Sequence, residues 1–122
     1  AMHSIVYSRS TLGFEFSEAE RQRLPGAVQP LVRTIPGSGR RSLYLASHAS
    51  HLIGWPVPES RLLLMDLIEH ATRPQFVHRH AWRAGDVVIW DNCCLLHSAP
   101  LTDPSQPRTL WRITVKDAGP TC

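Results

Sequence analysis

The residues with the clearest potential for chemistry lie near the C-terminus, in a segment from Trp90 to Arg112 that reads WDNCCLLHSAPLTDPSQPRTLWR. One imidazole, His97, is followed eleven residues later by Arg108 and four residues after that by Arg112. A neutral imidazole can bind a metal ion, and a guanidinium can hold a carboxylate through two parallel hydrogen bonds. These residues therefore predict a site for a metal and an acidic small molecule.

Strands are predicted on both sides of this segment. Phe76–Trp82 alternates between large and small or polar side chains as a strand does, and Ala84-Gly85 predicts a turn into a second strand over Asp86–Trp90. Thr109–Val115 alternates as well and predicts the last strand. His97 would then lie between two predicted strands, with Arg108 directly before the last strand and Arg112 within it.

The first third of the chain carries weaker signals. Met2–Tyr7 alternates and predicts a strand, with Ser8–Gly13 as a loop after it. Ser17-Glu18-Ala19-Glu20 is a capping box, so a short helix should begin there and run to about Leu24, before Pro25. Leu31–Ile35 and Ser42–Ala46 predict a β-hairpin around Pro36-Gly37-Ser38-Gly39.

A phosphate-binding loop is a weaker interpretation of the glycines in that hairpin, because the stretch lacks the Gly-Lys-Ser/Thr ending and opens no helix. Residues 47–58 contain two histidines, a tryptophan and prolines, which predicts an irregular surface segment. A helix is predicted over Pro58–Thr72, and its apolar residues recur at i, i+3, i+4 and i+7, so it should pack on a sheet. These residues are Leu64, Leu67, Ile68 and Ala71.

Composition limits the functional classes. The chain has 122 residues, 43% of them hydrophobic, and a net charge of +3, with its basic residues scattered rather than gathered in a stripe. No nucleic-acid motif is present. No apolar run reaches the roughly 20 residues that cross a bilayer, so we expect a cytoplasmic protein with no membrane partner. Cys93, Cys94 and Cys122 are odd in number and two are adjacent, which predicts free thiols.

The Trp90-Asp91-Asn92 motif followed by His97, Arg108 and Arg112 at these separations resembles the C-terminal signature of the taurine dioxygenase and 2,4-dichlorophenoxyacetate dioxygenase family. These enzymes depend on iron(II) and 2-oxoglutarate. Three further stretches follow in the family's order and favour the phenoxyacetate branch. They are Gln29–Thr34, Gly37–Leu45 and His70–Phe76.

The resemblance implies the second half of a double-stranded β-helix, a jelly roll: mainly β, with one or two packed helices. It implies that His97 is an iron ligand, that Arg108 holds the distal carboxylate of 2-oxoglutarate, and that Arg112 meets an anionic group of a small substrate. Trp90 should pack near the site and Asn92 should shape the turn, which Asp91 could cap. Two positions depart from the family pattern: Cys93 and Ile35 stand where Arg and His are usual.

Two of the three expected iron ligands are missing from the sequence. The family takes a His and a carboxylate from an upstream His-x-Asp or His-x-Glu motif, and no histidine of this chain has an acid two residues later. We therefore expect residues 1–122 to be the C-terminal portion of a longer dioxygenase domain, inactive and free of cofactor alone. Whether this chain is itself an enzyme stays open.

Other interpretations of the same residues remain. His97 could be satisfied by backbone groups at a strand end, and Arg108 and Arg112 could form surface ion pairs. Cys93-Cys94-x-x-His97 could be interpreted as part of a zinc site. Against this, adjacent cysteines on a strand point to opposite faces, and no second pair of ligands lies nearby in the sequence. His78 and His80 could bind a metal adventitiously or could simply be solvated.

A function of a different class is also consistent with the sequence. If the short chain is the natural product, it would be a non-catalytic binding or assembly module derived from a truncated dioxygenase. Half a jelly roll exposes unpaired strand edges, so such a module should form homo-oligomers.

Overall fold

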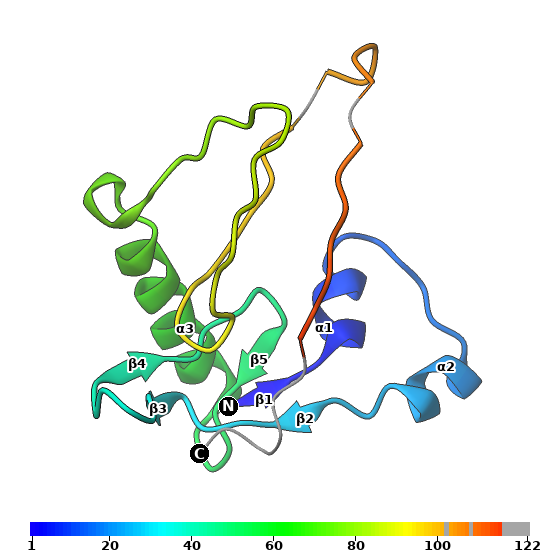
Figure 1. Cartoon of the computed structure of the whole chain (residues 1–122). Coiled ribbons are helices and arrows are strands. Elements are labelled where there is room, and N and C mark those ends of the chain that lie inside the picture. Colours follow the sequence, from blue (N-terminus) through cyan, green and yellow to red (C-terminus); the bar gives the residue numbers. More distant parts are fainter. Residues whose placement is uncertain (102, 108, 116–122) are drawn as a thin grey trace.

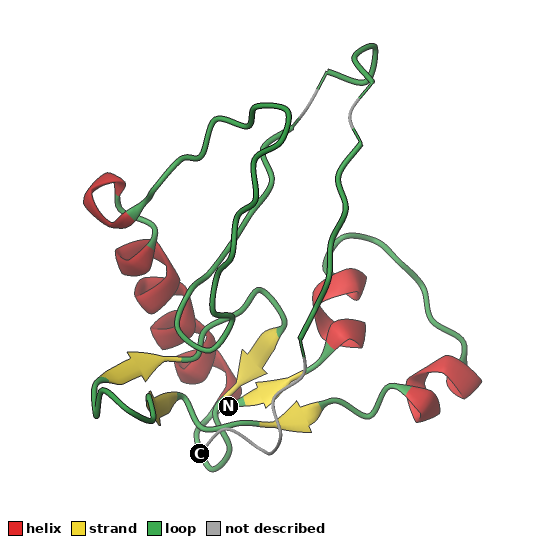
Figure 2. Ribbon diagram, in the orientation of Figure 1, coloured by secondary structure: helices red, strands yellow, loops and turns green. Residues whose placement is uncertain are grey.

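The protein is described by a computed structural model that covers residues 1–101, 103–107 and 109–115. Within these residues, two small antiparallel sheets form the base, and three α-helices lie around them (Figures 1 and 2). The first sheet has the order β2-β1-β5, with β2 at Ala27–Val28, β1 at Met2–His3 and β5 at Ala49–His51. The second is a hairpin of β3 (Val32–Thr34) and β4 (Arg41–Leu43).

The predicted hairpin is confirmed. β3 and β4 pair antiparallel with Val32 opposite Leu43 and Thr34 opposite Arg41. The turn between them closes through the Ile35 N–H, which donates to the Arg40 carbonyl at 2.8 Å. Gly37 has a φ of +78°, which L-residues with a Cβ rarely adopt, so glycine fits this turn.

Both predicted helices are confirmed. α2 spans Glu18–Arg23, and its capping box is formed as expected: Ser17 Oγ accepts from the Glu20 N–H at 3.3 Å, and Glu20 accepts from the Ser17 N–H at 2.8 Å. The Ser17 N–H, and after it the Ser17 hydroxyl, which also donates to the Glu20 carboxylate at 2.8 Å, lower the pKa of that carboxyl. α3 spans Val57–Ala71, within one residue of the predicted bounds.

The core lies where α3 packs on β5. Leu64 of α3, Ala49 of β5 and Leu45 are buried, and the rest of the predicted apolar stripe is partly buried against them. That stripe consists of Leu67, Ile68 and Ala71. The helical period of the apolar residues thus identified the face of α3 that meets the sheet.

The start of the chain differs from the prediction. The strand ends at His3, and α1 occupies Ile5–Ser10, where a strand end and a loop were expected. The physical reason is local: Ser4 is an N-cap whose hydroxyl accepts from the Tyr7 N–H at 3.2 Å, and this starts a helix.

The segment predicted to be irregular surface also differs, because it contains β5. Ala49 and Ser50 are buried there, and Ser50 Oγ donates to the Met2 carbonyl at 3.2 Å. β5 exists because it pairs with β1, which lies far away in the sequence. Such long-range pairing leaves no local signal.

The three strands predicted towards the C-terminus are not formed among the described residues. A 3-10 turn, η1, occupies Pro74–Phe76, and the described residues from 77 to 115 contain no helix or strand. The predicted turn at Ala84-Gly85 is present, with the Asp86 N–H donating to the Arg83 carbonyl at 3.1 Å. A strand requires a hydrogen-bonded neighbour as well as an alternating sequence, and here the neighbour is lacking.

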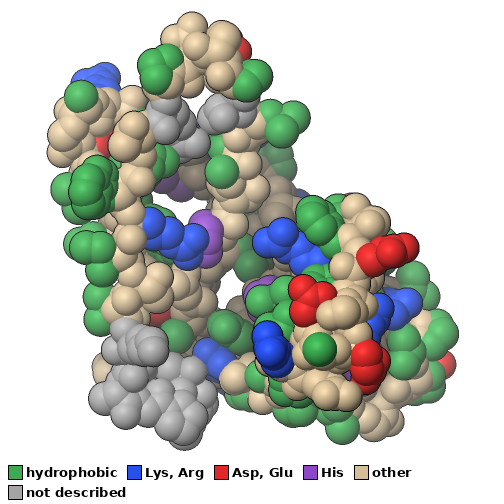
Figure 3. Space-filling view, turned by 90° about the vertical axis from the view of Figure 1, so that its right-hand side faces the viewer, with side chains coloured by type: hydrophobic (Ala, Val, Ile, Leu, Met, Phe, Trp, Pro, Cys, Tyr) green, Lys and Arg blue, Asp and Glu red, His purple; other side chains and the backbone are tan. Residues whose placement is uncertain are grey.

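This long arm, residues 77–115, therefore exposes apolar side chains. Figure 3 shows hydrophobic side chains on the surface of the upper part of the molecule, away from the sheets. The most exposed of these residues are Val87, Ile89, Leu101, Trp111, Ile113 and Val115. Among the described residues, no helix is both long enough and apolar enough to span a membrane.

Candidate functional site

The candidate site begins with a tight turn after Trp90. The Leu95 N–H donates to the Asp91 carbonyl at 3.0 Å, and the Asp91 carboxylate accepts from the Cys93 N–H at 2.7 Å. This backbone hydrogen bond is the main reason that the pKa of Asp91 is lowered. The interpretation of Asp91 as the cap of this turn is confirmed.

The turn is also tied to the hairpin. Ser42 of β4 donates through its hydroxyl to the Cys93 carbonyl at 3.3 Å, a contact between residues 51 apart in the chain. The position of the turn is therefore set by the sheet region as well as by its own hydrogen bonds.

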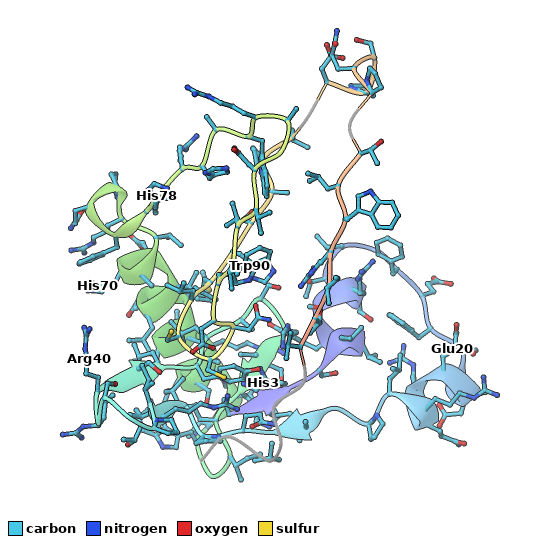
Figure 4. The ribbon with its side chains drawn as sticks, viewed as in Figure 1. His3, Glu20, Arg40, His70, His78 and Trp90 are labelled. Atoms are coloured by element: carbon cyan, nitrogen blue, oxygen red, sulfur yellow. The ribbon has the colours of Figure 1, made fainter. Side chains whose placement is uncertain are left out.

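The side chain of Trp90, labelled in Figure 4, contacts three other residues of the candidate site. Its indole N–H donates to Asn92 Oδ1 at 2.9 Å, which fixes the orientation of the ring. The imidazole of His97 lies against this ring, with 5.1 Å between ring centroids and 48° between ring planes. The expectation that Trp90 packs near the predicted metal ligand agrees with this geometry.

The same indole brings in a second predicted residue. The guanidinium carbon of Arg112 lies 5.9 Å from the centroid of the Trp90 ring, near the outer limit of a cation-π contact. His97 and Arg112, fifteen residues apart in the sequence, therefore meet on one side chain. Arg108 lies outside the described residues.

A complete metal site is not formed by the described residues. His97 is exposed, and no group of three or more His, Cys, Asp or Glu side chains is arranged to hold a metal ion in the described part of the chain. Two histidines and a carboxylate are the usual set for non-haem iron. The described residues fit one position of that set and not the other two.

The zinc interpretation gains no support from the turn. Cys93 and Cys94 are free and half-buried. Burial, together with the nearby Asp91 carboxylate, raises the pKa of the Cys94 thiol, and zinc binds the thiolate. The electrostatics of the turn thus oppose a metal-binding role for Cys94.

His80, which the sequence pairs with His78 as a possible metal site, forms part of a turn. His80 Nε2 lies 3.0 Å from Asp86 Oδ2, and the same oxygen accepts from the Arg83 N–H at 2.8 Å. The ring of His80 also meets that of Trp82 edge-on at 4.8 Å. His80 therefore closes the turn at residues 83–86.

Sequence reasoning missed a buried polar cluster formed by His3, Arg33 and Tyr44. His3 and Arg33 are each only 5% exposed, and the guanidinium carbon of Arg33 lies 3.5 Å from the centroid of the Tyr44 ring. Spacing could not have revealed this cluster, because its members come from three segments that only the fold brings together.

Comparison with known proteins supplies the class. Residues 1–114 match the family model described as "Taurine catabolism dioxygenase TauD, TfdA family". Because this match covers nearly all of the chain, the chain belongs to the TauD/TfdA family of dioxygenases. The resemblance carried by Trp90-Asp91-Asn92 and the residues after it is confirmed.

The chain is also similar in sequence to individual members of this family. The chain is 49% identical over 115 residues to the alpha-ketoglutarate-dependent 2,4-dichlorophenoxyacetate dioxygenase of Burkholderia sp. strain RASC, covering 93% of this chain and 39% of that protein. It is 39% identical over 118 residues to the (S)-phenoxypropionate/alpha-ketoglutarate-dioxygenase of Sphingobium herbicidovorans, covering 91% of this chain and 41% of the relative. The chain thus spans about two fifths of the length of these relatives.

Solved structures of two related proteins are also similar to this chain. A candidate alpha-ketoglutarate dependent 2,4-D dioxygenase from Burkholderia xenovorans is 51% identical and superposes with a TM-score of 0.72, covering 76% of this chain and 36% of that one. The structure of AAD-2 in complex with Mn(II) and N-oxalylglycine is 52% identical with a TM-score of 0.64, covering 67% of this chain and 33% of that one.

Proposed function

We propose that the chain forms the C-terminal part of an iron(II)- and 2-oxoglutarate-dependent dioxygenase that hydroxylates a small anionic organic substrate, within a jelly-roll domain. The main support for the proposal is that His97 and Arg112 both contact the ring of Trp90, in a chain that belongs to this family. An imidazole and a guanidinium held by one rigid indole are suited to a metal next to an anion.

Each residue has a distinct role in this proposal. His97, in its neutral form, provides one ring nitrogen to iron, and Trp90 limits the orientations of its ring. Arg108 holds the distal carboxylate of 2-oxoglutarate, and Arg112 binds the anionic group of the substrate. When bound in a complete domain, iron with 2-oxoglutarate supplies the oxidising chemistry, while these side chains supply position and charge.

The chain alone should show no turnover, because its described residues provide one iron ligand. The remaining ligands would come from a polypeptide segment outside the sequence given, which agrees with the two fifths of the relatives' length that it spans. The small anionic substrate is inferred from relatives whose names specify 2,4-dichlorophenoxyacetate and (S)-phenoxypropionate.

The test uses the product of the complete coding sequence. Succinate release that depends on an aryloxy carboxylate should be lost in His97→Ala, and titration calorimetry with Mn(II) should show weaker metal binding. His70→Ala is a matched control, since His70 is an exposed histidine at the end of α3 (Figure 4). Equal Mn(II) affinity in the wild type and in His97→Ala would contradict the proposal.

Arg112 can be tested separately. Loss of one charge-assisted contact costs about 1.5–3 kcal/mol, so Arg112→Gln should raise the KM for an anionic substrate by roughly 10- to 150-fold. The KM for 2-oxoglutarate should change little. A variant with the opposite pattern would show that Arg112 serves the keto acid instead.

A second candidate function is favoured by the exposed arm. Residues 77–115 present apolar side chains without strand partners among the described residues, as expected of a non-catalytic module that assembles with copies of itself. Light scattering on the 122-residue chain should then give a dimer or a larger oligomer. A folded monomer would exclude this candidate.

A further inference from the structure

The cluster of His3, Arg33 and Tyr44 lies in the sheet region: His3, labelled in Figure 4, is on β1, and Arg33 is on β3. The Arg33 guanidinium stacks on the Tyr44 ring. The His3 ring lies 5.2 Å from the Tyr44 ring and 5.1 Å from the ring of His48, measured between centroids. Arg33 and His3 thus both contact the Tyr44 ring, and a second imidazole, that of His48, lies beside His3.

The hydrogen bonds of this cluster are incomplete. Arg33 donates from one terminal nitrogen to Gln29 Oε1 at 2.6 Å, but among the described residues its Nε has no partner, and neither ring nitrogen of His3 has one. Buried polar atoms are nearly always paired, because each one left without a partner costs about 1–3 kcal/mol. Arg33 Nε and the protonated ring nitrogen of His3 are both donors, so these unpaired atoms on two side chains that contact Tyr44 indicate a missing acceptor.

The charges around the cluster are also unbalanced. No carboxylate among the described residues forms an ion pair with Arg33. The ion pair that these residues do form joins His80 and Asp86 in another part of the chain. Burial, together with the charges of His48, the N-terminal amine and Arg33, lowers the pKa of His3 to about 4. A buried guanidinium without an anion is a strongly unfavourable arrangement.

We propose that this cluster binds a carboxylate, with one oxygen accepting from Arg33 Nε and the other accepting from a ring N–H of His3. A carboxylate matches the planar edge of a guanidinium, and a single one would pair both side chains. With Arg33 and His3 each 5% exposed, a small planar anion fits better than a larger one. The Tyr44 ring forms the flat wall beside it.

Two sources could provide the carboxylate: a free small acid, or an Asp or Glu side chain of a polypeptide segment that docks on this face. The chemistry is the same in both, and the test separates them. The proposal does not depend on His97 or on iron, so it can fail while the proposed dioxygenase function holds.

The test is an NMR titration of the histidine rings in the 122-residue chain, in sodium acetate or succinate and in sodium chloride of equal ionic strength. An opposite charge at hydrogen-bonding distance raises an imidazole pKa by about 1–3 units, so the pKa of His3 should rise by that amount in the carboxylate. His70, exposed on α3, is the internal control and should not respond.

Arg33→Gln removes the cation while keeping an amide donor, and it should abolish the response of His3 to acetate. The wild-type titration itself needs no variant, so the result stands even if Arg33→Gln fails to fold. A response of His3 in the chain alone assigns the site to a free acid.

The second arm uses the product of the complete coding sequence. No response to acetate in the 122-residue chain, together with a His3 pKa raised by about one unit or more in the longer protein, assigns the site to an acidic side chain. A His3 pKa that stays near 4 in the longer protein and in every carboxylate solution overturns the proposal.

Discussion

Acidification should destabilise this chain through the burial of His3. The pKa of His3 falls from 6.5 to about 4 on folding, mainly because burial disfavours its charged form. Above pH 6.5 the ring is neutral in both states and adds no pH dependence. Between pH 6.5 and about 4 the unfolded chain binds a proton that the folded chain does not, so the free energy of unfolding falls as the pH falls.

The magnitude follows from this window. Each pH unit between the two values lowers the free energy of unfolding by about 1.4 kcal/mol, so the whole window amounts to about 3 kcal/mol. Because His3 is only 5% exposed, solvent screening reduces this figure little. A loss of this size is a large part of the stability of a small domain.

The assay is urea unfolding followed by tryptophan fluorescence between about pH 7.5 and about pH 4.5, in buffers without carboxylates. Over this range the free energy of unfolding should fall by about 2.5 kcal/mol more in wild type than in His3→Gln. Carboxyl groups with lowered pKa, such as Asp91, also lose stability as the pH falls, and comparing the two proteins cancels their contribution.

Parallel pH dependences for wild type and His3→Gln would refute the reasoning. His70→Gln is the matched control and should keep the wild-type slope, since His70 is exposed. If His3→Gln does not fold, direct NMR titration of the His3 ring in wild type decides the same question. Acetate should weaken the acid effect if the cluster binds a carboxylate.

Three further predictions test the core, a turn and the site. Leu64→Ala should lower the free energy of unfolding by about 2–5 kcal/mol, whereas Met65→Ala, 66% exposed on the same helix, should cost less than about 1 kcal/mol; equal losses in urea unfolding would count against the packing of α3. Gly26→Ala should destabilise the chain more than Gly37→Ala by at least about 1 kcal/mol. Both glycines have positive φ, but a Cβ at Gly26 would lie 2.6 Å from the His3 carbonyl oxygen and one at Gly37 would meet nothing within 4 Å; similar unfolding midpoints would show that this crowding is relieved. Asn92→Ala should expose the Trp90 indole N–H to faster solvent exchange in NMR spectra, with the Trp55 indole as the reference signal; unchanged exchange would mean that Asn92 does not hold the ring.

Sequence patterns succeeded where the interactions are local. The capping box of Ser17 and Glu20 involves residues three apart, and the apolar stripe of α3 reflects a period built into one helix. The hairpin between β3 and β4 follows from glycines that accept the turn. The same locality explains an error, because the cap at Ser4 could have been recognised from its residue type.

The arm at residues 77–115 shows where patterns are insufficient. Alternation predicts that a segment is extended and which of its side chains are apolar, but it does not say whether a neighbouring strand is available. The predicted strands around Asp86–Trp90 and Thr109–Val115 therefore lack ladders among the described residues. The jelly roll stays part of the proposed function.

The sequence alone determined the family, the candidate residues His97 and Arg112, and the local elements, because each depends on residue types at fixed separations. Only the tertiary structure decided that β1 pairs with β5, that His97 and Arg112 both contact Trp90, and that His3 and Arg33 are buried with no acidic partner in the described part of the chain. The physical reason is that contacts between distant segments depend on how the whole chain packs. The spacing of residues in the sequence does not predict which polar side chains will be buried without a hydrogen-bond partner.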